Sequence, residues 1–447
     1  MKAKKIIAAL AALSLTAALH FSCLYPMSVR AEGDSSISTE TDLAADPVIS
    51  RNVPAYTGKA ANPGYGNDEH YFTLWNADAP EYLAYDLSKV PESRRKTVIA
   101  VWYNLSSYDR LGQYVSKRAE PLDYTIELNA AEGDSYPESG WITAESVTDN
   151  PYSSRQHIIN MEGYNWIRLN ISKAEGDKIE LNFDVHDVSD GVLDSWMFYG
   201  DSITAGGMVN AYGTSFAKYI NQIDPSCFPV QENGGIGGIR SIEGRENIDT
   251  WLSVCKARYV SLAYGTNDAW GNPNGAAAYY DNTKYMIDAV IAAGKIPVLP
   301  KIPSSTNKDV GPNVGYYNEM VEKLYREYGD KLVKGPDFEL FFRENPQYLS
   351  DDGVHPDSEG YEAMRKLWAE TMYENVYKKV ALPAVRGDVN NDGSFSLADA
   401  ALLQKWILAF QGTALENWQA GDMNSDNKLN VVDLAVMKSQ LLEVPTV

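Results

Sequence analysis

The sequence predicts a multidomain protein with an all-β sandwich, then an α/β domain, and then a small all-α module. Short alternating or β-branched segments, separated by Gly, Pro, Asn and Asp clusters, fill residues 56–192 and are typical of an antiparallel sandwich. Strand and helix segments alternate over residues 193–380, which predicts a parallel sheet covered on both faces. Two matching acidic loops, 388–399 and 422–433, indicate a duplicated unit at the end of the chain.

The start of the chain has the composition of an export signal. Lysines at positions 2, 4 and 5 precede an apolar run from Ile6 to Leu19, and small residues around Ala31 follow, so we expect residues 1–31 to be a secretory signal peptide. Residues 32–55 are acidic and rich in Ser and Thr, a composition that predicts a flexible leader. No later apolar run reaches the ~18 residues of a membrane span. We therefore expect a secreted, extracellular protein with no membrane partner.

The charge of the chain bears on which partners it can bind, and its cysteine content bears on whether disulfides hold the fold. The formal net charge of −21 repels phosphate backbones, so nucleic acid is not expected as a partner. Beyond the predicted signal, Cys227 and Cys255 are the remaining cysteines, which cannot form a disulfide framework. A single bridge and two buried thiols both remain open.

The region 56–192 supplies the strands of the predicted sandwich. We expect strands at 97–104, 122–129, 156–161, 164–171 and 178–185. Aromatic residues of this region can either stack on sugar rings or fill the core, and the core is favoured because half-buried strands prefer aromatic side chains. These aromatics are Trp75, Trp102, Tyr103, Tyr108 and Trp141.

The region 193–380 alternates apolar strands with helices. Strands are expected at 195–200, 228–233, 257–265 and 295–302, with helices such as 276–293 and 357–378. In parallel sheets of this kind ligands bind outside the carboxyl ends of the strands. A short linker, 381–386, is expected to lead into the last module, 387–447.

Four polar blocks of this region fit one chemistry. They are Gly200-Asp201-Ser202, residues 233–238 (NGGIGG), residues 265–268 (GTND) and residues 352–356 (DGVHP). A serine hydroxyl needs a base within hydrogen-bond reach, and His355 is the one histidine of residues 195–380. Asp352 lies three residues earlier and can hold the imidazole tautomer, with Asp351 as a rival. Taken singly, Ser202 could cap a helix and NGGIGG could be a turn.

The four blocks, in this order, resemble those of the SGNH (GDSL-type) hydrolases, which are esterases on a flavodoxin-like α/β sheet. The resemblance covers about residues 195–380. It implies that Ser202 is the nucleophile and that Asp352 and His355 complete a triad. It also implies an oxyanion hole made by the backbone N–H groups of Ser202 and Gly238 and by the side-chain amide of Asn267.

The two C-terminal loops read DVNNDGSFSLAD and DMNSDNKLNVVD. Oxygen-bearing side chains fall at loop positions one, three, five, nine and twelve, and a backbone carbonyl is expected at position seven, which is the pattern of a calcium loop. The expected ligands are Asp388, Asn390, Asp392, Ser394, Ser396 and Asp399 in the first loop, and Asp422, Asn424, Asp426, Lys428, Asn430 and Asp433 in the second.

Aspartate at position twelve, one helix after each loop, and the duplication together resemble a dockerin, a module that plugs an enzyme into a cohesin of a scaffold protein. The resemblance covers about residues 386–443 and implies structural Ca²⁺ and a cohesin partner in a cellulosome.

Together these features predict a cellulosomal carbohydrate esterase that removes acetyl groups from plant cell-wall polysaccharide, such as xylan, through an acyl-enzyme on Ser202 and without a cofactor for catalysis. The order of a sandwich before an SGNH-like domain also resembles that of some acetylxylan esterases and related deacetylases. Two alternatives remain open: a lipase or thioesterase of the same fold, and a non-catalytic carbohydrate-binding component.

Overall fold

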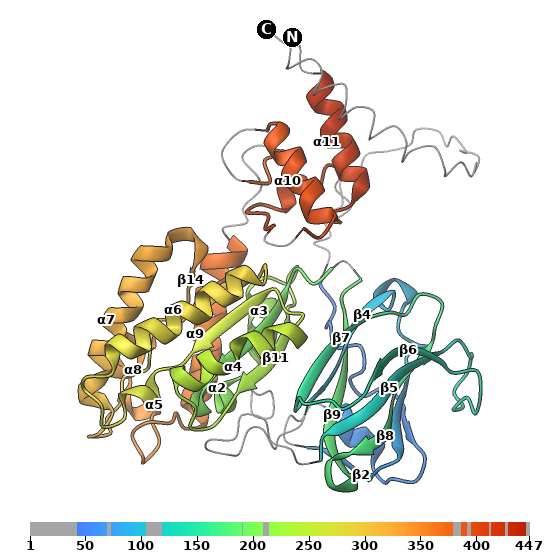
Figure 1. Cartoon of the computed structure of the whole chain (residues 1–447), viewed down its shortest axis with the longest axis horizontal. Coiled ribbons are helices and arrows are strands. Elements are labelled where there is room, and N and C mark those ends of the chain that lie inside the picture. The colour runs from blue at the N-terminus through green and yellow to red at the C-terminus, as the bar shows by residue number, and fades with distance from the viewer. Residues whose placement is uncertain are drawn as a thin grey trace. The chain divides into compact units, whose positions relative to one another are not determined.

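The computed structural model describes residues 43–68, 73–103, 119–189, 191–208, 214–378, 386–390, 395–410, 413–424 and 428–443, which Figure 1 draws in colour. The predicted signal peptide, the first part of the predicted leader, Tyr108 and most of the predicted linker lie outside these residues. In the described ranges, no helix is both long and apolar enough to cross a membrane.

Residues 43–189 contain two antiparallel sheets, which we call the N-terminal β region. A five-stranded sheet has the order β1-β3-β8-β5-β6, and a four-stranded sheet has the order β2-β9-β4-β7. Their strands are β1 (Ala55–Thr57), β2 (Trp75–Asp78), β3 (Glu81–Asp86), β4 (Thr97–Tyr103), β5 (Pro121–Asn129), β6 (Ile142–Val147), β7 (Ser154–Asn160), β8 (Trp166–Ala174) and β9 (Lys178–Asp187). Both sheets contribute to one apolar core, which supports the expected sandwich in part.

The expected flexible leader is wrong over its described end. Val48 forms an antiparallel bridge with His186, and the Ile49 N–H donates to the Val185 carbonyl at 2.9 Å. Ile49 and Ser50 are buried. The short apolar pair Val48-Ile49 thus continues the sheet beside β9, a tertiary contact that the acidic average composition of the segment conceals.

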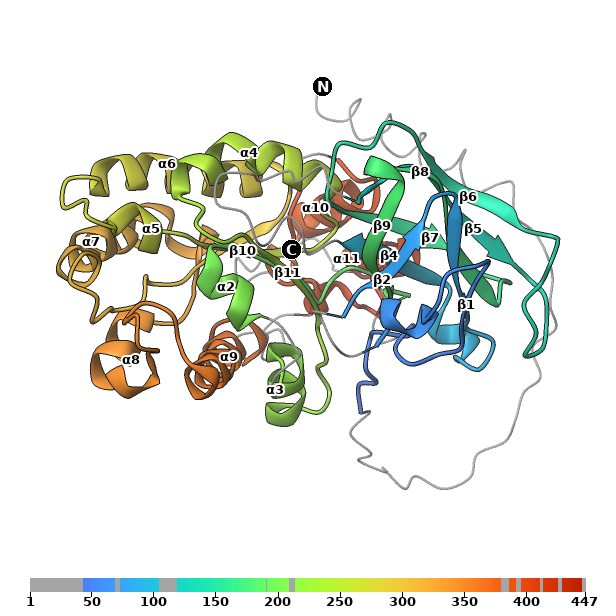
Figure 2. The ribbon, with the colours of Figure 1, turned by 90° about the horizontal axis from the view of Figure 1, so that it is seen from below.

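The second half of the described chain is a parallel α/β sheet with the order β11-β10-β12-β13-β14. Its strands are β10 (Ser195–Gly200), β11 (Val230–Gly235), β12 (Tyr259–Ala263), β13 (Ile296–Leu299) and β14 (Val333–Lys334). Helices α4 and α6 lie on one side of the sheet, and α3, α8 and α9 lie on the other (Figure 2). This arrangement is the parallel sheet covered on both faces that the alternation of strands and helices predicted.

The helices of this domain are α2 (Ser202–Gly207), α3 (Phe216–Ile223), α4 (Ser241–Val254), α5 (Thr266–Ala269), α6 (Ala276–Ala292), α7 (Gly311–Tyr328), α8 (Phe338–Glu344) and α9 (Ser358–Met372). Register aligns the carboxyl ends of the three strands that matter for the site, because Gly200 pairs with both Gly235 and Ala263. Cys227 and Cys255 are free thiols, and Cys255 is buried.

The C-terminal module contains α10 (Leu397–Ile407) and α11 (Val431–Glu443), each directly after one predicted loop. Val389, Leu403 and Met437 are among the buried side chains of its small separate core. This matches the expected small all-α unit.

Candidate active site

Ser202 lies at the turn between β10 and α2. Gly200 ends the strand, and a Cβ on Gly200 would clash with the Thr204 side chain, so the sharp turn requires glycine. Asp201 is the N-cap of α2, and its carboxylate accepts a hydrogen bond from the Ile203 N–H at 2.9 Å. Ser202 is therefore the first residue of a helix at the carboxyl edge of the sheet, where its N–H is not used within the helix.

A line of hydrogen bonds joins Ser202 to His355 and Asp352. Ser202 Oγ is 2.7 Å from His355 Nε2, and His355 Nδ1 is 2.6 Å from Asp352 Oδ2. An ionised Asp352 requires the proton on Nδ1, which leaves Nε2 to accept from the serine hydroxyl. The structure thus brings the three predicted triad residues together, and Asp352 rather than Asp351 contacts the imidazole.

Asp352 is held in its charged form. Burial alone would raise its pKa, but hydrogen bonds from the His355 ring and from the backbone N–H groups of Val354 and His355 outweigh burial and lower the pKa below its ordinary value. The two backbone bonds to Oδ1 measure 2.8 and 2.9 Å, and Ser350 Oγ donates to the same oxygen at 2.9 Å.

The loop that carries Asp352 and His355 is braced by residues 305–307, which sequence reasoning missed. Gly353 has a φ of 68°, and a Cβ there would clash with Thr306. Ser305 Oγ donates to the Gly353 carbonyl at 2.6 Å, and Asn307 Nδ2 donates to the Asp352 carbonyl at 3.1 Å. These contacts join segments far apart in the chain, so no local sequence pattern predicts them.

The predicted oxyanion residues follow the two strands on either side of β10. The loop after β11 is fixed by the Ile236 N–H, which donates to the Gly200 carbonyl at 2.9 Å. Gly238 in this loop has a φ of 74°, a conformation that favours glycine. Asn267, in α5 after β12, uses one amide hydrogen on the Ile239 carbonyl at 3.0 Å, which leaves its second hydrogen for a ligand.

Two buried carboxyl groups near the site were not predicted to matter. Burial raises the pKa of Asp201 to about 7, against the opposing hydrogen bond from Ile203. Burial also raises the pKa of Asp268, whose carboxylate accepts from the Ser241 N–H at 2.9 Å and so ties α5 to the start of α4. Both aspartates belong to polar blocks that the sequence already singles out, Asp201 to GDS and Asp268 to GTND.

The aromatic residues considered for sugar stacking separate into different surroundings. Trp75 and Trp102 are fully buried in the core of the N-terminal β region. Tyr103 donates to Asp184 at 3.0 Å, and Trp141 packs against the Arg168 guanidinium, which lies 4.2 Å from its ring centroid. The core role expected for aromatics of this region holds for the two tryptophans on strands.

Part of each predicted calcium loop is described. Asp388, Asp399 and Asp433 are buried, and a buried carboxylate is costly without a compensating cation or hydrogen bonds. Asp399 accepts from the Asn390 and Ser396 N–H groups, and Asp433 accepts from the Asn430 N–H. The oxygen donors of Asp, Asn and Ser side chains suit a hard cation such as Ca²⁺.

The other predicted calcium ligands lie partly inside and partly outside the described residues. Asn424, Asp422 and Lys428 are described, whereas Asp392, Ser394 and Asp426 lie outside the described residues. Within the described parts of the chain, no three His, Cys, Asp or Glu side chains are grouped to hold a metal. Ser396 Oγ also accepts from the Ala398 N–H at 3.1 Å and thereby caps α10.

Comparisons with known proteins identify two domains. Residues 198–363 match the GDSL-like Lipase/Acylhydrolase family, and residues 386–442 match the Dockerin type I domain. The chain therefore contains a GDSL-type domain, a class of carboxylic ester hydrolase, followed by a dockerin type I domain. These matches agree with both resemblances drawn from the sequence.

One curated protein, a multidomain esterase from Ruminococcus flavefaciens, is 26% identical over 206 residues, which cover 41% of this chain and 26% of that protein. The match thus spans about a quarter of the length of that relative. Among solved structures, the lipase/acylhydrolase from Enterococcus faecalis is 18% identical, with a TM-score of 0.35 over 41% of this chain and 96% of that chain. An acetylxylan esterase from Geobacillus stearothermophilus is 19% identical, with a TM-score of 0.34 over 42% of this chain and 95% of that chain.

Proposed function

We propose that this protein is a secreted serine esterase that removes acetyl groups from plant cell-wall polysaccharide. One observation carries the esterase part: Ser202 Oγ, His355 and Asp352 form a continuous hydrogen-bonded line, with distances of 2.7 and 2.6 Å. Such a line is what nucleophilic catalysis by serine requires, since the base must reach the hydroxyl and must itself be oriented.

In the proposed mechanism, His355 Nε2 takes the Ser202 proton while Oγ attacks the carbonyl carbon of the ester. The N–H groups of Ser202 and Gly238 and the free amide hydrogen of Asn267 stabilise the tetrahedral oxyanion. His355 then returns the proton to the leaving sugar oxygen. A water molecule then attacks the acetyl carbonyl carbon while His355 Nε2 takes its proton, and collapse of this second tetrahedral intermediate returns that proton to Ser202 Oγ and frees acetate.

The substrate class rests on the combination of domains. An ester hydrolase domain supplies the chemistry, while a dockerin type I domain is suited to a cohesin of a scaffold that gathers polysaccharide-degrading enzymes. Acetyl esters on polysaccharide are the substrate that joins these two roles. We propose an extracellular, cellulosome-associated enzyme on the same grounds.

Calcium is proposed for the dockerin domain alone. Asp388, Asn390, Ser396 and Asp399 from the first loop, and Asp422, Asn424, Asn430 and Asp433 from the second, are the described side chains that would hold it. Its charge would offset the repulsion among loop carboxylates and so stabilise the folded loops.

Acetate release from acetylated xylan, mannan, pectin and chitin fragments tests the substrate class. Each reaction is run with the wild type and with Ser202→Ala, so that acetate released without the nucleophile is subtracted. We expect release from at least one plant polysaccharide. Activity confined to long-chain acyl esters would instead support a lipase or thioesterase, and a wild type inactive on every acyl ester would support a non-catalytic binding component.

A further inference from the structure

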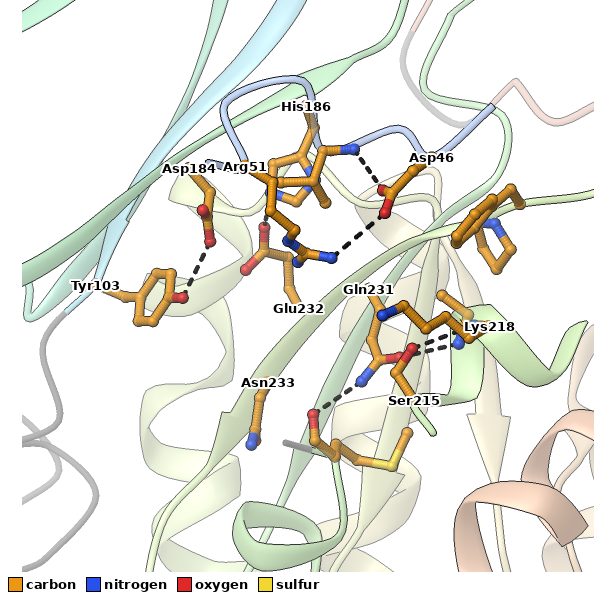
Figure 3. Close-up of a pocket in the computed structure, with 15 residues that line it drawn as sticks. Asp46, Arg51, Tyr103, Asp184, His186, Ser215, Lys218, Gln231, Glu232 and Asn233 are labelled. Carbon is orange, nitrogen blue, oxygen red and sulfur yellow. Dashed lines mark hydrogen bonds and ion pairs between the residues drawn. The ribbon is translucent and has the colours of Figure 1, made fainter. Parts of the chain in front are cut away.

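A cavity of about 60 Å³ lies where the N-terminal β region meets the edge strand β11 (Figure 3). Asp46, Asp184 and His186 line it from the β region, and Glu232 and Asn233 line it from β11. Its walls are rich in charge, and His186 and Glu232 among the lining residues are buried. The charged groups must therefore find partners inside the protein.

Most of the polar groups named below form hydrogen bonds within one wall of the cavity, either in the β region or in the α/β domain. Arg51 donates to Asp46 at 3.4 Å, and Tyr103 donates to Asp184 at 3.0 Å. On the opposite wall, Gln231 donates to the Met208 carbonyl at 2.8 Å. These bonds stabilise each wall but do not join the two walls.

His186 and Glu232 form an ion pair across the contact, as the centre of Figure 3 shows. His186 Nε2 lies 2.9 Å from Glu232 Oε1, and the two side chains are 3% and 10% exposed. Burial alone would lower the pKa of His186, but the carboxylates of Glu232 and Asp184 outweigh it, despite the nearby Arg51 charge, and raise the pKa. The Glu232 carboxylate on β11 therefore favours protonation of the imidazole that faces it.

β11 connects this ion pair to the catalytic residues. The residue after Glu232 is Asn233, whose Nδ2 donates to the Ala205 carbonyl in α2 at 2.9 Å. Its Oδ1 accepts from the Gly235 N–H at 3.0 Å, and Gly235 packs so closely on Ala205 that a Cβ would clash with the helix backbone. β11 therefore positions the helix that begins with Ser202, and it leads directly into the loop of Gly238.

We propose that His186 is a positioning residue for the esterase site, acting through Glu232 and β11 on the placement of Ser202 and Gly238. The N-terminal β region is then part of the catalytic scaffold and not an independent appendage. This inference rests on the proposed esterase function. A shift of about 1 Å in a positioned group is enough to slow a reaction about a hundredfold, so a distant buried pair can affect the rate.

The test is a double-mutant cycle on 4-nitrophenyl acetate with His186→Gln, Glu232→Gln and the double variant. We expect each single variant to lower kcat about tenfold or more with KM changed less than about twofold, because placement of the nucleophile affects the transition state more than binding. The double variant should be no slower than the slower single variant, since the two side chains act as one unit. His186→Lys, which keeps a cation opposite Glu232, should recover part of kcat.

Gln156→Ala is the matched control. Gln156 on β7 accepts a hydrogen bond from the Lys256 N–H at 2.6 Å, another contact between the β region and the α/β domain, but one that precedes β12 and lies away from its carboxyl end. We expect this variant to lower the Tm and leave kcat unchanged.

Any of three kinetic results would overturn the inference: wild-type kcat in the His186 and Glu232 variants, additive losses in the cycle, or a kcat loss of the same size in Gln156→Ala. Insoluble protein from both positions would also overturn it, because the pair would then support the whole fold. A wild type without esterase activity contradicts the proposed function itself, which separates that failure from failure of this inference.

Discussion

His355 takes part in more proton transfers of the proposed mechanism than any other residue. It takes the proton from Ser202, gives it to the leaving group and then activates water. Replacing His355 by Ala should lower kcat on 4-nitrophenyl acetate by about a thousandfold or more, leaving the contribution of the oxyanion hole and binding. The Tm should change little, since the side chain is part-exposed. A near-normal rate would remove His355 from the mechanism.

The two adjacent aspartates offer a matched comparison at the same scale. Asp352→Asn should lower kcat strongly, because an amide facing Nδ1 favours the wrong imidazole tautomer. Asp351→Asn changes the same functional group one residue earlier, where the side chain does not contact His355, and should leave kcat near the wild-type value. The reverse order in measured kcat would move the triad acid to Asp351.

Sequence reasoning predicted Ser202, His355 and Asp352, which the structure places within hydrogen-bond distance of one another, because each belongs to a short block of chemically distinctive residues. It did not reach Ser305, Thr306 and Asn307, which brace the loop of Asp352 through contacts between distant segments. Nor could it find the raised pKa of Asp201, since burial of a helix cap depends on the packing of the whole domain.

Asp201, the N-cap of helix α2, has a raised pKa of about 7, so its titration falls within the pH range of a stability measurement. The pKa of Asp201 rises with burial from 3.8 to about 7, so the native state keeps a proton that the unfolded state has lost across this range. Stability contributed by the neutral carboxyl is therefore lost as pH rises from about 4 to about 7. Asp201→Asn keeps an acceptor oxygen for the Ile203 N–H and removes the titration.

The expected result is a smaller fall in Tm between about pH 5 and about pH 7.5 for Asp201→Asn than for the wild type. Asp194, whose pKa burial raises to about 6, contributes equally to both proteins and cancels in the difference. Equal falls in the two proteins would show that Asp201 is ionised in the native state over this range.

The contact of α2 with β11 is close enough to be tested by one methyl group. Gly235→Ala places a Cβ against the Ala205 backbone, which should push α2 away from the strand and lower both Tm and kcat. Gly315→Ala in α7 is the control, because beyond the adjacent residues and the local helix backbone no atom lies within 4 Å of the added Cβ. There the higher helix propensity of Ala should raise stability by about 0.5–1 kcal/mol without changing kcat. Equal effects of both variants would contradict this account of the turn.

Element prediction succeeded where apolar runs are strong and local. The strand expected at 195–200 coincides with β10, and the one expected at 228–233 overlaps β11 but ends two residues early. The early end has a physical cause, since the strand continues through Gly234 and Gly235, which have low strand propensity and are held by pairing with β10. The packing of Val48 and Ile49 beside β9 was missed for the same reason: tertiary pairing overrode composition.

At the scale of the whole molecule, the dockerin domain is expected to act independently of the esterase site. Asp388→Ala combined with Asp422→Ala removes the first ligand of each loop, so calcium-dependent ordering of residues 386–443 and cohesin binding should both be lost. Activity on a small soluble ester should stay near the wild-type value, and chelation by EDTA should leave it unchanged as well. Calorimetric calcium titration and a cohesin pull-down measure the first two effects.

A double variant that still binds a cohesin in EDTA would contradict the proposed docking role. One that loses esterase activity would show that the two domains are coupled. The sequence predicted separate esterase and dockerin domains because each carries its own ordered motifs. The contact between His186 and Glu232, which joins the β region to β11, could not be predicted because it involves single residues with no motif around them.

The central claim is that Ser202 is the nucleophile of an esterase, and turnover of 4-nitrophenyl acetate by the wild type and by Ser202→Ala tests it most directly. The account predicts steady hydrolysis by the wild type, an acetyl group recovered on the peptide that contains Ser202 after rapid acid quenching, and no enzymatic turnover by the variant although its melting curve matches the wild type. Wild-type rates in a folded Ser202→Ala protein, or an acetyl group trapped on another residue, would contradict it.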